Sequence, residues 1–155
     1  MPKIAEHELS LSRIINAPPE KVFRAWADPD LLIEWWAPLP YRTSHAVIDM
    51  RPSGAFNTTM HAPTGEIYEN LGIFLDVVAN QRLVFTDAFR EGWVPGDRPF
   101  MTGYVTFEDA GNGATKYVAR ALHWTAEDMQ THREMGFEEG WNAAAEQMEA
   151  LLQRL

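Results

Sequence analysis

The sequence of 155 residues contains no cysteine. Without thiol groups the chain can form no disulfide, no thiolate nucleophile and no cysteine-ligated zinc or iron–sulfur site. No apolar run approaches the roughly 20 residues that a membrane-spanning helix needs, and Met1–Ser10 lacks the apolar centre of a secretory signal. We therefore expect a cytoplasmic protein that does not insert into a membrane.

Positive charge is scarce. The chain carries 13 Lys and Arg residues against 22 Asp and Glu residues, which gives a formal charge of −9, and no local basic cluster offsets it. Such a field repels the phosphates of nucleic acids and anionic membrane surfaces. We therefore expect no nucleic-acid partner.

The common short motifs of catalysis and cofactor binding are also missing. The chain has no phosphate-binding P-loop and no dinucleotide fingerprint, and Ser53-Gly54 lies in a turn without the flanking glycine of the G-x-S-x-G elbow. Neither H-E-x-x-H nor H-x-H occurs, so no histidine spacing indicates a metal. From these absences we expect no metal site and no cofactor, and we assign no catalytic residue.

What remains is an ordinary globular composition. Hydrophobic residues make up 46% of the chain, too many for a disordered sequence. No repeat, low-complexity tract or Gly/Ser linker divides the chain, and its length suits one core. We predict a single domain over residues 1–155.

The N-terminal part predicts one strand followed by two short helices. Residues Glu8–Ile15 alternate between apolar and polar side chains, as a half-buried strand does. Pro18-Pro19 and Asp28-Pro29 are both typical of a helix start, and apolar residues at helical spacing follow each of them.

The middle of the chain predicts an antiparallel meander. Runs rich in β-branched and aromatic residues are separated by turn sequences; they are Ser44–Met50, Ala55–Met60, Ile67–Val78, Arg82–Ala88, Phe100–Glu108 and Thr115–Leu122. Gly72 predicts a bend or bulge within its strand. The loop Phe89–Phe100 holds two prolines and two glycines, with Trp93 at its tip.

The C-terminal part predicts one long amphipathic helix. Thr125 and Asp128 form a capping-box-like start, and apolar or small residues then follow at helical spacing to the end of the chain. Such a helix would have about 30 residues and a length of roughly 45 Å. Laid on one face of a curved antiparallel sheet, it gives an α+β fold.

Four segments carry a resemblance to a known family. NAPPEKVFRAWADPDLLIEWWAP, VIDMRPSGAF, ENLGIFLDVVANQRLVF and MGFEEGWNAAAEQMEALL occur in this order. Together they resemble the activator of heat-shock-protein-90 ATPase homologues, within the START-related helix-grip (SRPBCC) superfamily, from about Leu9 to Leu152. The resemblance implies a curved antiparallel sheet wrapped around the C-terminal helix, with an apolar cavity for lipids or other hydrophobic small molecules. It also implies, as an alternative, a stress-related chaperone accessory.

Two glycines lie one turn apart in the predicted final helix. Gly136 and Gly140 would each weaken it by roughly 1 kcal/mol relative to alanine. Three interpretations stay open: close approach of a neighbouring element, volume left for a ligand, or a kink. Gly72, Gly103, Ala119 and Ala121 are small residues that would extend the same gap.

A ligand cavity needs apolar walls and a few polar groups. The candidate ligand-binding residues are aromatic, thioether, imidazole or glycine positions on the predicted strands and helices; they are Trp36, His45, Phe56, Met60, Tyr68, Phe74, Phe85, Tyr104, Tyr117, His123, Met129, His132, Gly136, Gly140 and Trp141. Ordinary core packing is the alternative for each large side chain. If His123 and His132 face the gap, we expect them to donate hydrogen bonds to a ligand carbonyl or carboxylate.

The leading hypothesis is non-catalytic binding of a small hydrophobic ligand, lipid-like or aromatic, between the sheet and the C-terminal helix. The loop Phe89–Phe100 would then act as a mobile lip. The second hypothesis is a module that binds a chaperone. The third is a cavity enzyme of the cyclase or aromatase type, in which Glu66, Tyr68 or His123 would do acid–base chemistry if they line the cavity. The oligomeric state is not indicated by the sequence.

Overall fold

A computed structural model describes residues 2–155 and contains four helices and one large sheet. The elements in chain order are β1 (Glu8–Ile15), α1 (Pro19–Ala27), α2 (Pro29–Trp35), β2 (Arg42–Ile48), β3 (Ala55–His61), β4 (Ile67–Val78), β5 (Arg82–Thr86), β6 (Phe89–Arg90), β7 (Val94–Pro95), β8 (Thr102–Gly111), β9 (Ala114–Leu122), α3 (Ala126–Glu134) and α4 (Phe137–Gln153). Seven strands form one antiparallel sheet in the order β1-β9-β8-β5-β4-β3-β2, and β6 and β7 form a separate small hairpin.

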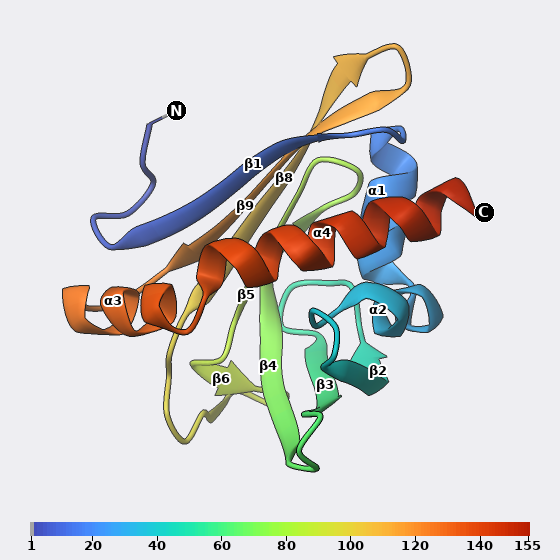
Figure 1. Ribbon diagram of the computed structural model, residues 1–155. Helices are drawn as coiled ribbons and strands as arrows, with labels where there is room; N and C mark the ends of the chain where they lie inside the picture. The colour runs from blue at the N-terminus through green and yellow to red at the C-terminus, as the bar shows by residue number, and fades with distance from the viewer. Residues whose placement is uncertain (1) are drawn as a thin grey trace.

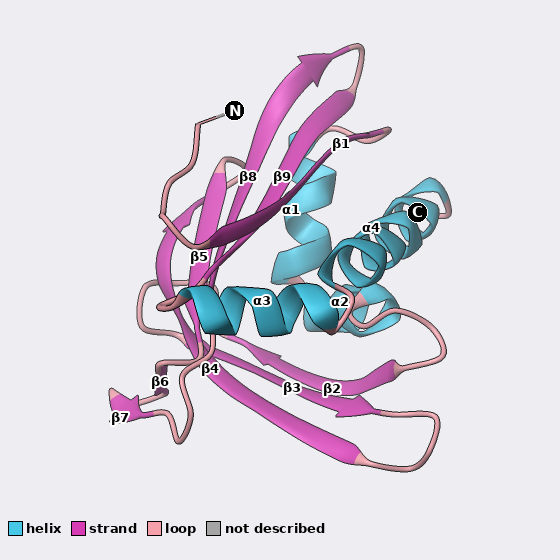
Figure 2. Ribbon diagram, turned by 60° about the vertical axis from the view of Figure 1, so that its left-hand side comes forward, coloured by secondary structure: helices cyan, strands magenta, loops and turns pink. Residues whose placement is uncertain are grey.

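The sheet curls around the helices. Figure 1 shows α4 crossing in front of the sheet, with α1 and α2 beside its C-terminal half. In the turned view of Figure 2, the strands β1, β8 and β9 form one arm of the curl and β2, β3 and β4 form the other, with the helices within the angle. The predicted α+β helix-grip fold, with two short helices after the first strand, is confirmed.

Local sequence explains the first elements. In β1 the side chains of Leu9, Leu11 and Ile15 are buried while Ser10 and Ser12 are exposed, because successive residues of a strand point to opposite faces. Both α1 and α2 have proline in the first turn, and the carboxylate of Asp28 accepts a hydrogen bond of 3.0 Å from the backbone N–H of Asp30.

The curvature coincides with irregular pairing. The β4–β5 register shifts between Phe74 and Asp76, and such a bulge bends a strand and increases its twist. Gly72 lies two residues before this shift, where the backbones of the two strands are close. A Cβ atom there would meet the carbonyl oxygen of Thr86 at 2.5 Å. Glycine thus lets β4 approach the backbone of β5 just before the bulge.

The prediction of one continuous C-terminal helix is wrong. The chain forms two helices, because Gly136 adopts a left-handed conformation with φ of 93° and ends the helical path between Glu134 and Phe137. The predicted start is confirmed, since the hydroxyl of Thr125 accepts a hydrogen bond of 3.0 Å from the N–H of Asp128. Only Gly140 lies inside a helix.

Neither glycine brings another backbone into close contact. A Cβ atom at Gly136 would meet only the Glu139 carboxylate at 3.4 Å, and one at Gly140 would meet only Pro38 Cγ at 3.8 Å.

Among the residues that the structure describes, no helix combines the length and the apolar character that crossing a bilayer requires.

The two glycines should respond oppositely to alanine. We expect Gly136→Ala to lower the free energy of unfolding by about 1–2 kcal/mol, because alanine is disfavoured in the left-handed region. Gly140→Ala should raise it by roughly 0.5–1 kcal/mol, because alanine favours a helix and the site has room. Urea denaturation of both variants tests this. Stabilisation by both substitutions would indicate one continuous helix.

Candidate functional site

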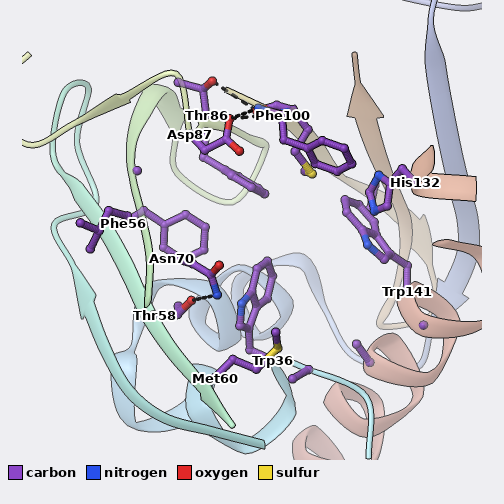
Figure 3. A pocket seen from close by; sticks show the side chains of 18 of the residues that line it. Trp36, Phe56, Thr58, Met60, Asn70, Thr86, Asp87, Phe100, His132 and Trp141 are labelled. Carbon is purple, nitrogen blue, oxygen red and sulfur yellow. Dashed lines mark hydrogen bonds between the residues drawn. The ribbon is translucent and has the colours of Figure 1, made fainter. Parts of the chain in front are cut away.

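A cavity of about 550 Å³ lies between the concave face of the sheet, the end of α2 and the first turns of α4. This volume is within the range of roughly 300–1,000 Å³ that is usual for small-molecule sites. Figure 3 shows side chains that line it, with Phe56 and Trp36 on one side and His132 and Trp141 on the other. The final helices are therefore held off part of the sheet.

Aromatic side chains form the wall on the β3 side. The ring of Phe56 stacks on Phe74 with a centroid distance of 4.9 Å, and Trp36 meets Phe56 edge-on at 5.5 Å. Behind them Trp26 is 2% exposed, and its indole N–H donates to the Tyr117 hydroxyl at 3.3 Å. Rings packed edge to face fix this wall geometrically.

The chain after α2 positions Trp36. The hydroxyl of Thr43 donates to the carbonyl oxygen of Trp36. Gln147 of α4 donates to the carbonyl oxygens of Trp35 and Ala37 at 3.2 and 2.9 Å, and its own carbonyl oxygen accepts from the N–H of Leu39 at 2.9 Å. One glutamine thus fixes the distance between α4 and the Trp36 wall.

The opposite wall is built from the loop before β8 and from the last two helices. The centroid of the His132 ring lies 5.2 Å from Phe100, 5.2 Å from Phe137 and 5.9 Å from Trp141. Phe137 and Trp141 are one helical turn apart on α4, with their centroids at 4.5 Å. This wall exists because the turn at Gly136 brings α3 and α4 together.

A pair of histidines adds polar chemistry to this wall. His123 Nδ1 lies 2.9 Å from the carbonyl oxygen of Phe100, and its Nε2 lies 3.0 Å from Nδ1 of His132. Burial, with a smaller contribution from His123, lowers the pKa of His132 to about 4. A carbonyl oxygen only accepts hydrogen bonds, so Nδ1 of His123 carries a proton.

Asp87 is an acidic residue at the cavity that was not among the sequence-based candidates. The Asp87 carboxylate accepts hydrogen bonds from the N–H groups of Phe100 and Met101 at 2.8 and 3.2 Å. Burial raises its pKa, although these two bonds oppose that effect. Asp87 follows β5 directly and so holds the end of the Phe89–Phe100 loop against the sheet. No motif in the sequence marks this role.

Part of the predicted set lines the cavity. The candidates against the cavity are Trp36, Phe56, Met60, Phe85, Tyr117, His132, Gly140 and Trp141. The candidates away from it are His45, Tyr68, Phe74, Tyr104, His123, Met129 and Gly136.

The displaced candidates have identifiable places. His45 is exposed on β2, and Tyr68 is 44% exposed near the start of β4. Tyr104 lies on the face of β8 opposite to that of its buried neighbours Gly103 and Val105. Phe74 is fully buried behind Phe56. Gly136 lies in the turn between helices.

The remaining two displaced candidates are Met129 and His123, neither of which lines the cavity. Met129 packs against the small cluster of Leu9, Ala121 and Phe137. His123 is not among the residues that line the cavity, and both of its ring nitrogens are engaged by Phe100 and His132.

Several lining residues were missed because they are polar or lie in the loop. Thr58 and Asn70 face each other across β3 and β4, and the Asn70 amide donates to the Thr58 hydroxyl at 3.4 Å. The loop Phe89–Phe100, expected at the cavity mouth, contributes Arg90, Gly96, Asp97, Arg98 and Phe100 to the lining. Apolar patterning cannot find such residues, since only the fold brings them to the cavity.

The trio suggested for a cavity enzyme is not assembled. Glu66 and Tyr68 are exposed and outside the cavity, and Glu66 accepts a hydrogen bond from Thr64. Within residues 2–155 no group of three or more His, Asp or Glu side chains is placed to hold a metal ion.

Comparisons with known proteins agree with this geometry. The family described as Activator of Hsp90 ATPase homolog 1-like protein matches residues 16–153. A crystal structure from Nitrosomonas europaea is 37% identical with a TM-score of 0.92, covering 97% of this chain and 96% of that one. A Mycobacterium smegmatis protein is 28% identical with a TM-score of 0.79, covering 94% and 90%. A search of curated proteins gives no significant match.

The histidine pair predicts a pH dependence of stability. Between the ordinary pKa near 6.5 and the folded value of about 4, the unfolded chain binds a proton at His132 that the folded chain does not. The free energy of unfolding should therefore fall as the pH drops from about 6.5 to about 4. We expect a smaller fall for His132→Phe in urea denaturation at several pH values.

The matched control is His45→Phe, which removes an exposed histidine on β2. In this variant the free energy of unfolding should change with pH as steeply as in the wild type. An equally steep change in His132→Phe and in the wild type would show that the pKa of His132 is not lowered by folding.

Proposed function

The chain belongs to the family of Activator of Hsp90 ATPase homolog 1-like proteins, and from this membership and its cavity we propose that it binds a small hydrophobic ligand without catalysing a reaction. The ligand is lipid-like or aromatic and lies between the sheet and α4. The cavity of about 550 Å³ is the observation that carries the proposal.

The cavity walls suit such a ligand energetically. Trp36, Phe56 and Phe85 pack edge to face on one wall, and Trp141 lies on the opposite wall. Polar side chains, among them Thr58 and Asn70, line part of the cavity. Burying about 200 Å² of apolar ligand surface contributes roughly 5 kcal/mol. The entropy lost on association offsets part of this, so this burial alone supports binding in roughly the millimolar range.

The loop Phe89–Phe100 acts as the lip of the cavity in this proposal. Its C-terminal end is held by Asp87, whereas Trp93 at its tip is 60% exposed and contacts Phe89 at a centroid distance of 5.6 Å. Movement of the tip relative to the held end would open a path for the ligand.

A second candidate function follows from the family description, which names activation of the Hsp90 ATPase. Trp93, Val94 and Trp124 are exposed apolar residues, and a shallow hollow lined by Phe89, Pro95 and Trp124 lies among them. Exposed aromatic residues are frequent at protein interfaces. This surface is the site at which a chaperone would bind.

Filling the cavity should abolish ligand binding. With 2-methylnaphthalene as probe and titration calorimetry as the measurement, we expect saturable binding to the wild type and at least about tenfold weaker binding to Gly140→Leu, equal to about 1.4 kcal/mol. Gly140 lines the cavity and has space for a side chain. Ala150→Leu, at an exposed position of α4, is the control and should bind normally. No saturable binding of this probe or of 1-dodecanol to the wild type would refute the proposal.

The chaperone hypothesis has a separate test. If it holds, the ATPase rate of a purified Hsp90-type chaperone should rise when the wild-type chain is added, and Trp93→Ser should lose the effect while Gly140→Leu keeps it. An unchanged rate at saturating concentrations of the wild type would refute this second candidate.

A further inference from the structure

The carbonyl group of Phe100 sets the direction of a short hydrogen-bond chain. Its oxygen accepts from Nδ1–H of His123, so in the neutral imidazole Nε2 of His123 is an acceptor. Within residues 2–155, the only group placed to donate to that nitrogen is Nδ1 of His132, at 3.0 Å. In neutral His132 the proton therefore lies on Nδ1, and Nε2 carries a lone pair.

That lone pair has no partner, since no described residue makes a hydrogen bond with Nε2 of His132. Among the described residues, the only side-chain nitrogen or oxygen both sealed from solvent and without a partner is Nε of Arg13. Nε2 of His132 is therefore not sealed, and the His132 ring lines the cavity beside Trp141 (Figure 3).

The surroundings keep this nitrogen an acceptor. The rings of Phe100, Phe137 and Trp141 enclose the imidazole, and the low pKa of about 4 means that it stays neutral at pH 7. No carboxylate hydrogen-bonds to His132 among the described residues, so none stabilises a charged ring. Because the tautomer is fixed and Nε2 is a free acceptor, this position favours a ligand group that donates a hydrogen bond.

A carboxylate ligand does not match this site. Its oxygens carry only lone pairs, which repel the lone pair of Nε2, and its charge would lose hydration in an apolar cavity. Charged residues along the lining give no positive balance, because Arg90 and Arg98 lie among Glu69, Asp87 and Asp97. A hydroxyl group supplies the missing donor. The Trp141 ring, whose indole N–H makes no hydrogen bond with a described residue, lies 5.9 Å from the His132 ring between centroids.

We propose that the cavity selects hydrophobic ligands that carry an alcohol or phenol hydroxyl, which donates a hydrogen bond to Nε2 of His132. The inference rests on the proposed function and specifies its ligand class. It replaces the sequence-based expectation that the histidines donate to a ligand carbonyl or carboxylate.

Three probes with one ring system test the selection. At pH 7 we expect 2-naphthol to bind the wild type about fivefold more tightly than 2-methylnaphthalene, the gain of one net hydrogen bond. The third probe, 2-naphthoate, should bind most weakly. In His132→Phe the ratio of the Kd for 2-methylnaphthalene to the Kd for 2-naphthol should fall to about 1, while His45→Phe should keep the wild-type ratio.

A spectroscopic measurement covers the case in which His132→Phe folds poorly. In ¹⁵N spectra of the wild type, Nε2 of His132 should resonate as an unprotonated imidazole nitrogen and shift when 2-naphthol is added, but not when 2-methylnaphthalene is added. A protonated Nε2, or the same response to both probes, would overturn the inference.

The binding outcomes separate the two proposals. Any of three results would overturn the hydroxyl selection alone. The wild type could bind 2-naphthol and 2-methylnaphthalene with equal affinity, it could bind 2-naphthoate most tightly, or the preference for 2-naphthol could persist in His132→Phe. Failure of every probe, 1-dodecanol included, would overturn the proposed function together with it.

Discussion

The left-handed turn at Gly136 is the constraint on which the cavity depends. On one side of it, Phe137 packs with Leu9 and Ala121 in a small cluster against the sheet. At the far end of α4, Met148 and Leu152 belong to the main core with α1 and α2. The helix is therefore held at both ends, and its first turns, with the small residues Gly140 and Ala144, border an unfilled space. The turn at Gly136 lets α3 fold back so that His132 packs against Phe137 and Trp141 at the start of α4, which completes the wall of that space.

Apolar periodicity and turn chemistry predicted most of the fold. β1 and β4 have the predicted limits and β9 begins one residue earlier, because alternation and flanking turn residues are local signals. The break at Gly136 was not predicted, although a kink was among the alternatives. A glycine within a helical pattern weakens the helix slightly, but only packing at both ends decides whether the chain turns there.

The candidate site was predicted less completely, for a physical reason. Trp36, Phe56 and Trp141 are large apolar residues whose burial the sequence pattern indicates, and the structure brings them to one cavity. The hydrogen bonds of Asp87, Gln147 and the His123–His132 pair join different elements of the fold, across 13, 110 and 9 positions of the chain. Their partners are backbone groups or a ring on another element, and a sequence pattern carries no signal for such pairings.

Xenon binding tests the central claim, an open apolar space between the sheet and α4, most directly. Xenon enters dry apolar cavities because they offer dispersion contacts without losing water. In crystals of the protein under xenon pressure, we expect anomalous density among Trp36, Phe56 and Trp141, with unchanged wall positions. Crystals that show no xenon there, and side chains of α4 packed directly against β3 and β4, would contradict the claim.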